Sequence, residues 1–157
     1  MKVRLRSEQD TASFARACAS WIEGGYSLGL KGDLGAGKTT FVRYLIEALK
    51  GDIRAVASPT YTLQHEYPVR DGLTVEHWDL YRLKELPEEL FGRTPKSVVR
   101  VIEWPERCPE INESLMIQIT ISMLVGSSSE SDERVVGIEG QESAALLSRI
   151  PPELVDS

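Results

Sequence analysis

The chain has 157 residues, which is the length of one ordinary domain with a core of its own. Hydrophobic residues make up 41% of it and charged residues 27%, a mixture that is typical of globular proteins and excludes a disordered or fibrous chain. The formal net charge of -6 argues against a protein that binds nucleic acid by itself, because contacts to phosphate need a basic surface. No apolar run reaches the ~18 residues of a membrane-spanning helix, and the opening "MKVRLRSEQDT" lacks the apolar stretch of a signal peptide, so we expect a cytoplasmic protein.

The first third of the chain alternates between strand and helix patterns. Residues 3–7 ("VRLRS") predict a short strand, and residues 7–25 predict a helix that begins after Ser7 and ends at a glycine pair. Residues 26–32 ("YSLGLKG") predict a second strand that runs directly into a glycine-rich loop. Residues 39–51 predict a helix, because their apolar side chains recur at helical spacing.

The rest of the chain predicts mainly strands. Residues 53–69 predict a strand, a turn at Pro59 and a second strand, and "DG" ahead of "LTVEHWDLYRL" predicts a hairpin. Residues 97–104 form a nearly continuous apolar run, as in a strand buried on both faces. The other predicted elements are a short helix or turn at 86–92, strands at 116–125 and 133–140 joined by the polar loop 126–132, a closing helix at 141–150 and a disordered tail at 151–157. We therefore expect one α/β domain over residues 1–157, P-loop NTPase-like, with a mixed sheet and helices on both faces.

The glycine-rich loop matches the phosphate-binding pattern G-x-x-x-x-G-K-[ST] from Gly32 to Thr39 ("GDLGAGKT"). Its glycines allow backbone N–H groups to turn inward around phosphate oxygens, Lys38 can reach the terminal phosphates of ATP, and the hydroxyl of Thr39 is placed for Mg²⁺. The strand before the loop and the helix after it fit this interpretation. The residues expected to bind nucleotide are Asp33, Leu34, Gly35, Ala36, Gly37, Lys38, Thr39 and Thr40.

A P-loop also needs an acid on the other side of the magnesium ion, and two are candidates. Glu103 follows the most buried strand, so it has the stronger claim on the metal, whereas Asp79 could orient the attacking water. A solvated acid at a strand end is the alternative for each. Thr60 follows a strand and could sense the γ-phosphate or belong to a plain turn. Trp104 could stack on adenine or pack in the core.

The remaining chemically active side chains give weaker signals. Cys18 and Cys108 lie far apart without metal-binding spacing, so we interpret both as packing residues. His65 and His77 have no partner spacing for a metal site or a catalytic triad, so we predict structural roles for both.

Four motifs occur in a fixed order: "GDLGAGKTT", "SPTYTL", "HWDLYRL" and "IEWPER". Together they resemble the TsaE family, over most of the chain. The resemblance implies a bacterial P-loop ATPase that acts with the TsaB and TsaD proteins to place a threonylcarbamoyl group on adenosine 37 of tRNA. The acidic net charge fits a chain whose partners hold the tRNA.

The resemblance also implies roles for individual residues. Thr39 and Glu103 would hold Mg²⁺, with Asp79 required for hydrolysis and a third candidate for the metal. Thr60 would act as a switch, and Trp104 would lie beside the nucleotide. Two further nucleotide contacts are implied, Thr11 and Arg134. Residues 87–100 are compact and basic where the family usually has a longer acidic stretch.

Two other functions remain open from the sequence. A small-molecule kinase would share the P-loop but would need a lid with phosphate-binding arginines, and no insertion of that size is visible. A nucleotide-dependent scaffold would bind ATP or ADP and dock to partners without turnover, and the sequence does not distinguish it from an ATPase.

Overall fold

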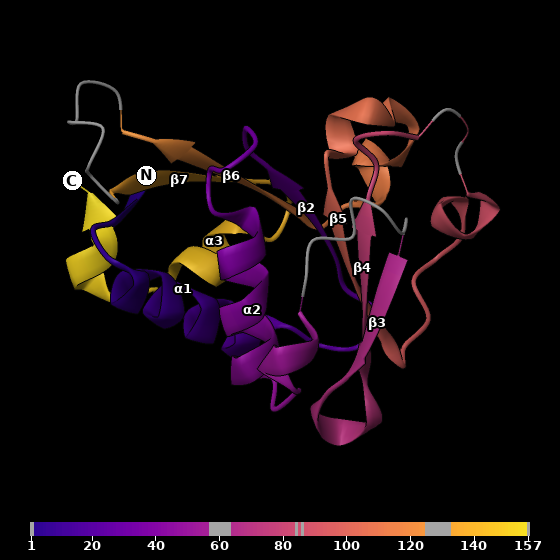
Figure 1. Cartoon of the computed structure of the whole chain (residues 1–157), viewed down its shortest axis with the longest axis horizontal. Helices are drawn as coiled ribbons and strands as arrows, with labels where there is room; N and C mark the ends of the chain where they lie inside the picture. The colour runs from indigo at the N-terminus through magenta and orange to yellow at the C-terminus, as the bar shows by residue number, and fades with distance from the viewer. Residues whose placement is uncertain (1, 57–63, 84, 86, 125–132, 157) are drawn as a thin grey trace.

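The computed structural model describes residues 2–56, 64–83, 85, 87–124 and 133–156. Its centre is an eight-stranded sheet with the order β3-β4-β5-β2-β6-β7-β1-β8 (Figure 1). The strands are β1 (Lys2–Leu5), β2 (Ser27–Lys31), β3 (Gln64–Pro68), β4 (Thr74–Asp79), β5 (Val98–Glu103), β6 (Ile117–Met123), β7 (Arg134–Glu139) and β8 (Val155–Asp156). The α-helices are α1 (Glu8–Trp21), α2 (Lys38–Ala48) and α3 (Ser143–Leu147). None of the helices in these ranges is long and apolar enough to cross a membrane.

The sheet is mixed, as the sequence predicts. Strands β4, β5, β2 and β6 run parallel to one another, whereas β3, β7, β1 and β8 pair antiparallel with their neighbours. The parallel strands end at the same edge, where Leu30 of β2 pairs with Glu103 of β5 and Glu103 pairs with Asp79 of β4. The loop after β2 therefore begins beside both predicted acids.

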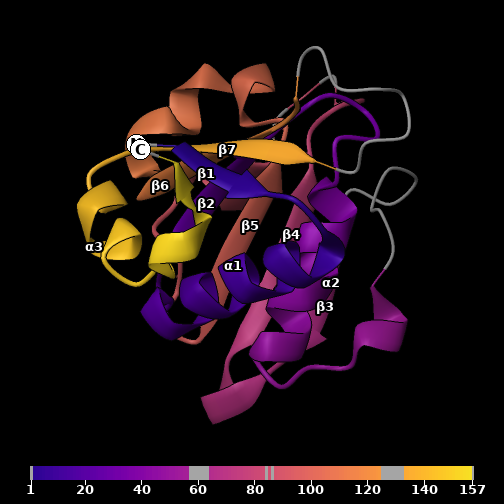
Figure 2. The same cartoon turned by 90° about the vertical axis from the view of Figure 1, so that its left-hand side faces the viewer.

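Both faces of the sheet are covered, but by different kinds of helix. Figure 2 shows α1 and α2 on one face and, on the other, the two short 3₁₀-helices of Pro105–Arg107 and Pro109–Ser114. On the first face Phe14 of α1 and Phe41 of α2 lie fully buried with ring centroids 5.4 Å apart. A smaller apolar cluster fills the other face: Trp78, Leu80, Leu90, Ile102, Cys108, Ile111 and Leu115. The predicted fold class is confirmed, with tight 3₁₀-helices in place of α-helices on the second face.

The hairpin prediction is confirmed and the strand prediction ahead of it is wrong. Asp71 and Gly72, between β3 and β4, have φ angles of 58° and 70°, the positive values of a type I′ turn, and a hydrogen bond of 3.0 Å from the Leu73 N–H to the Arg70 carbonyl closes this turn. Residues 53–55 instead form a 3₁₀-helix, because the Asp52 carboxylate accepts a hydrogen bond from the backbone N–H of Arg54 and closes a turn. The predicted turn at Pro59 lies outside the described residues, as does the loop 126–132.

The end of the chain is folded as far as Asp156, which corrects the expected disordered tail. Pro152–Leu154 form a 3₁₀-helix, and Val155–Asp156 pair with β1 at the edge of the sheet. Leu154 anchors this segment, since only 2% of it is exposed. The sequence does not predict this folded segment, because one buried leucine between prolines and acids carries no periodicity.

Candidate nucleotide-binding site

The P-loop has the backbone that phosphate binding needs. Gly32, Gly35 and Gly37 have φ angles of 151°, 80° and 110°, which side chains with a Cβ rarely adopt. Gly37 is the N-cap of α2 and offers no side chain to the first N–H groups of the helix. These N–H groups and the positive end of the helix dipole are therefore available to an anion at this position.

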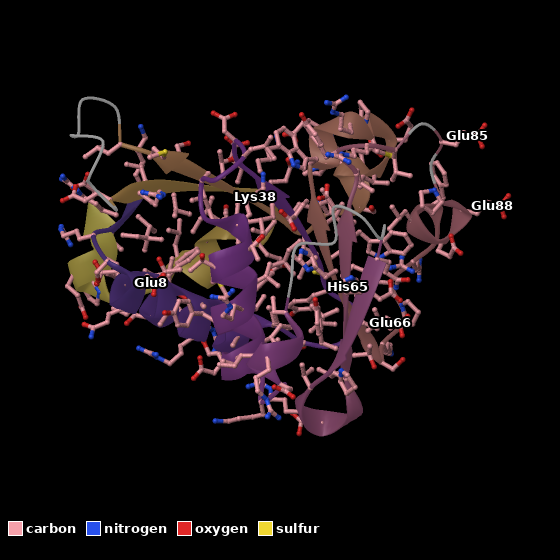
Figure 3. The ribbon with its side chains drawn as sticks, in the orientation of Figure 1. Glu8, Lys38, His65, Glu66, Glu85 and Glu88 are labelled. Atoms are coloured by element: carbon pink, nitrogen blue, oxygen red, sulfur yellow. The ribbon has the colours of Figure 1, made fainter. Side chains whose placement is uncertain are left out.

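Lys38 lies at the N-terminal end of α2 (Figure 3) and is only 6% exposed. Its ammonium group donates a hydrogen bond to the carbonyl of Gly32 and stands 4.2 Å from the centre of the Trp104 ring. Burial lowers the pKa of Lys38 from 10.5, and the nearby carboxylates of Glu103 and Asp79 oppose this shift. The lysine is thus held against its own loop, within the field of both predicted acids.

The two acids meet the P-loop at one cavity. Asp79 and Glu103 are 6% and 2% exposed, so neither is the solvated acid of the alternative interpretation. A cavity of about 230 Å³ brings together most of the predicted phosphate and metal residues: Leu34, Gly35, Gly37, Lys38, Thr39, Thr40, Asp79, Glu103 and Trp104. One oxygen of Asp79 also accepts a hydrogen bond of 2.9 Å from the backbone N–H of Tyr81. Buried carboxylates facing a lysine and a hydroxyl are unusual except where a charged ligand binds.

His77 contacts one of the two acids but does not line their cavity, so the structural role predicted for it stays a prediction. It is fully buried, and its Nε2 lies 2.5 Å from Oε2 of Glu103. The strand alternation contained the signal, because residues two apart on β4 share a face and His77 therefore lies on the same face as Asp79. The contact with Glu103 depends on the pairing of β4 with β5, which the sequence did not reveal.

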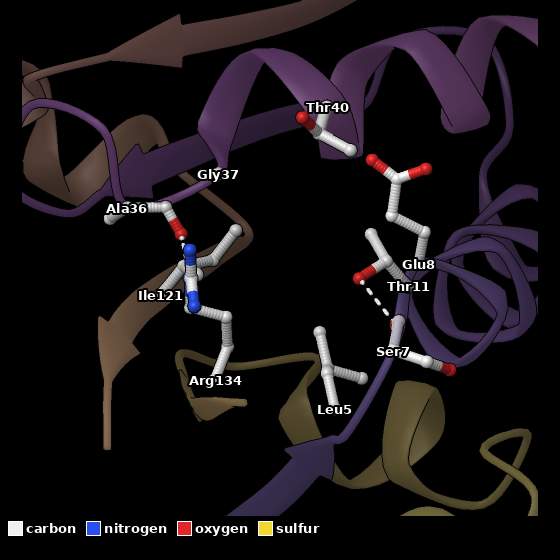
Figure 4. A pocket seen from close by; sticks show the side chains of 9 residues that line it. All are labelled: Leu5, Ser7, Glu8, Thr11, Ala36, Gly37, Thr40, Ile121 and Arg134. Carbon is white, nitrogen blue, oxygen red and sulfur yellow. Dashed lines mark hydrogen bonds between the residues drawn. The ribbon is translucent and has the colours of Figure 1, made fainter. Parts of the chain in front are cut away.

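A second cavity, of about 150 Å³, lies on the other side of the loop (Figure 4). It contains both of the distant residues predicted to contact nucleotide, Thr11 from α1 and Arg134 from β7. Nε of Arg134 donates a hydrogen bond of 2.8 Å to the carbonyl of Ala36 in the loop. Four lining residues were not predicted: Leu5, Ser7, Glu8 and Ile121. Gly37 and Thr40 line both cavities, so a phosphate chain in one can continue into a nucleoside in the other.

Two predicted residues lie apart from the cavity of Thr11 and Arg134, and a third falls outside the described residues. Trp104 lines the cavity of the acids and a third cavity, but not the cavity of Thr11 and Arg134. Asp33 lines neither of the two cavities and is exposed beside a third one. Thr60 lies outside the described residues.

A phosphate-binding loop between a central parallel strand and a helix, with acids at the ends of neighbouring strands, defines a P-loop protein. Within that class, residues 5–134 match the family model described as "Threonylcarbamoyl adenosine biosynthesis protein TsaE". The chain belongs to the TsaE family. The expected family is thereby confirmed.

Individual relatives agree with this assignment. The chain is 40% identical over 120 residues to the tRNA threonylcarbamoyladenosine biosynthesis protein TsaE of Aquifex aeolicus, covering 75% of this chain and 86% of that protein. It is 32% identical over 141 residues to the protein of the same name from Rickettsia bellii, covering 87% and 93%. The crystal structure of YdiB from Bacillus subtilis superposes with a TM-score of 0.65 at 30% identity, covering 96% of this chain and 93% of YdiB.

Proposed function

We propose that this chain is a magnesium-dependent ATPase of the cytoplasm that acts with TsaB and TsaD in forming threonylcarbamoyladenosine at position 37 of tRNA. The observation that carries the proposal is the single cavity in which the P-loop residues Lys38 and Thr39 face Asp79 and Glu103. Membership of the TsaE family supports the biosynthetic role.

The charges of this cavity support a divalent cation. It holds one ammonium group, from Lys38, and two buried carboxylates, from Asp79 and Glu103. A triphosphate would meet net negative charge there, so its binding needs an added positive charge. The available donors, a threonine hydroxyl and carboxylate oxygens, are the hard oxygen ligands that Mg²⁺ prefers. When bound, Mg²⁺ would neutralise charge on the β- and γ-phosphates.

Each residue of the site would then have a role that follows from its position. Thr39 and Glu103 would hold the ion, and Lys38 would turn from the Gly32 carbonyl to the terminal phosphates. Asp79 lies beside Glu103 and would orient the attacking water or share the ion. The nucleoside would occupy the cavity of Thr11 and Arg134.

The partner proteins TsaB and TsaD would supply the binding of tRNA. Its net charge of -6 disfavours independent binding of tRNA, so TsaB and TsaD would hold the nucleic acid. Hydrolysis would reset the assembly through contacts that change when the γ-phosphate leaves, with Thr60 as the proposed switch. Weak turnover by the isolated chain follows if the partners complete the site.

A scaffold without turnover is the second candidate, and one contact favours it. The hydrogen bond from the Tyr81 N–H to the Asp79 carboxylate gives that acid a structural task independent of catalysis. Asparagine at this position keeps an oxygen for the N–H but loses the negative charge. Asp79→Asn therefore separates the two functions.

The test is ATP hydrolysis by the chain alone and with TsaB and TsaD, comparing wild type with Asp79→Asn and Glu103→Gln. Glu66→Gln is the control, because Glu66 is an exposed carboxylate on β3 that does not line the cavity. An ATPase predicts turnover that rises several-fold with the partners, is lost in both cavity variants and persists in the control. Tight nucleotide binding with partners but no turnover would instead establish the scaffold.

A further inference from the structure

The metal role proposed for Glu103 determines which side chain of the buried pair His77 and Glu103 donates the hydrogen bond and which accepts it. A carboxylate that binds a cation is ionised, and an ionised carboxylate only accepts hydrogen bonds. Nε2 of His77, 2.5 Å from Oε2 of Glu103, must then carry the proton and donate it. This hydrogen bond occupies Oε2 and leaves Oε1 as the freer oxygen of Glu103.

The other ring nitrogen shows that stability alone does not favour histidine here. Nδ1 of His77 is buried and has no hydrogen-bond partner among the residues that the structure describes. A buried polar atom without a partner costs free energy, whereas an apolar side chain would avoid that cost. The register partner Val101 and the preceding same-face residue Val75 are both apolar and buried. Histidine at this position must be useful for what Nε2 does.

We propose that His77 is a positioning residue for the metal site: its Nε2–H fixes the Glu103 carboxylate so that the remaining oxygen faces the P-loop cavity. Ligating groups held by a second hydrogen bond bind their metal more tightly, and loss of such a partner costs on the order of 10–100-fold in affinity. The alternative is a side chain that only fills the space between β4 and the helix layer. This inference rests on the magnesium role proposed for Glu103.

The test compares nucleotide affinity with and without Mg²⁺ in two variants whose substituted side chains have similar lengths. In His77→Gln the amide nitrogen can still donate to Glu103, whereas His77→Met fills the space without a donor. The readout is the ratio of the ATP dissociation constant in EDTA to that in Mg²⁺, measured by calorimetry. We expect His77→Met to lose about 10-fold or more of this ratio, with the EDTA value unchanged, and His77→Gln to retain most of it.

Two controls make failure interpretable. His65→Met removes the histidine on β3 that pairs with His77 and whose Nδ1 is 3.0 Å from the Tyr67 hydroxyl. Strand β4 separates β3 from Glu103 on β5, so the ratio should remain at the wild-type value. In Glu103→Gln the ATP dissociation constant should be the same in EDTA and in Mg²⁺. If wild type shows no Mg²⁺ effect, or Glu103→Gln keeps it, the metal role itself is wrong and the inference falls with it. If Glu103→Gln behaves as expected while His77→Met matches wild type, only the role of His77 is refuted.

A measurement on wild type remains decisive should His77→Met fail to fold. Nitrogen-15 NMR of the histidine rings distinguishes a protonated from an unprotonated nitrogen. We expect His77 to carry its proton on Nε2 and to show a shift of that resonance when Mg²⁺ and ATP are added. A proton on Nδ1 alone, or no response to Mg²⁺ beyond that to ATP in EDTA, would overturn the assignment.

Discussion

Replacing Gly32 by alanine separates steric collision from backbone strain in the P-loop, because Gly35 offers a matched control. Both glycines have positive φ angles, 151° and 80°. A Cβ on Gly32 would lie 2.6 Å from the backbone oxygen of Ile121 in β6, whereas a Cβ on Gly35 would meet nothing within 4 Å. Alanine is thus strained at both positions but collides with the sheet only at the first.

The expected magnitudes follow from this difference. A backbone conformation that favours glycine costs a residue with a Cβ about 1–3 kcal/mol, and the smaller entropy of unfolded alanine returns about 0.4–1 kcal/mol at either position. The collision at Gly32 adds about 1–3 kcal/mol, the usual cost of overpacking, since a backbone oxygen cannot rotate away. Gly32→Ala should therefore lose about 1–3 kcal/mol more unfolding free energy than Gly35→Ala.

The assay is equilibrium unfolding in urea, followed by circular dichroism, for wild type and both variants. Equal losses for the two variants, within about 0.5 kcal/mol, would refute the reasoning, because strain is then the whole effect. A larger loss in Gly35→Ala would show that the tip of the loop, not its junction with the sheet, limits stability.

Three further predictions concern the core and the tryptophan. Burial raises the pKa of the Cys18 thiol, and burial together with the nearby Glu110 carboxylate raises that of the Cys108 thiol. Neither cysteine should therefore react with a thiol reagent at neutral pH until urea unfolds the chain. Fast labelling of the native protein would contradict their burial. Leu154→Ala should cost about 2–5 kcal/mol in urea unfolding because it empties a buried position, and a loss below ~0.5 kcal/mol would show that the last segment is not anchored. Because the ammonium group of Lys38 stands 4.2 Å from the centre of the Trp104 ring, ATP binding should change the fluorescence of Trp104. A fluorescence change that persists in Trp104→Phe would come from another tryptophan and would contradict this prediction.

Local patterns in the sequence were enough for several elements. The N-cap at Ser7 is confirmed by its hydrogen bond from Asp10 N–H, and "DG" forms the predicted hairpin turn. These features depend on interactions between residues a few positions apart. The strand predicted at residues 53–55 is wrong for a reason that is also local. The Asp52 side chain accepts a hydrogen bond from the backbone N–H of Arg54, and this turn outweighs the strand preference of the side chains.

The sequence by itself determined the P-loop, because its glycines, Lys38 and Thr39 are contiguous and their chemistry depends on the backbone of one loop. It also determined which acids end buried strands. Only the tertiary structure decided that Asp79 and Glu103 share a cavity, that His77 contacts Glu103, and that Trp104 lies beside the lysine. These contacts depend on the lateral order of β4, β5 and β2, and strand order is set by packing of the whole sheet rather than by any short stretch of residues.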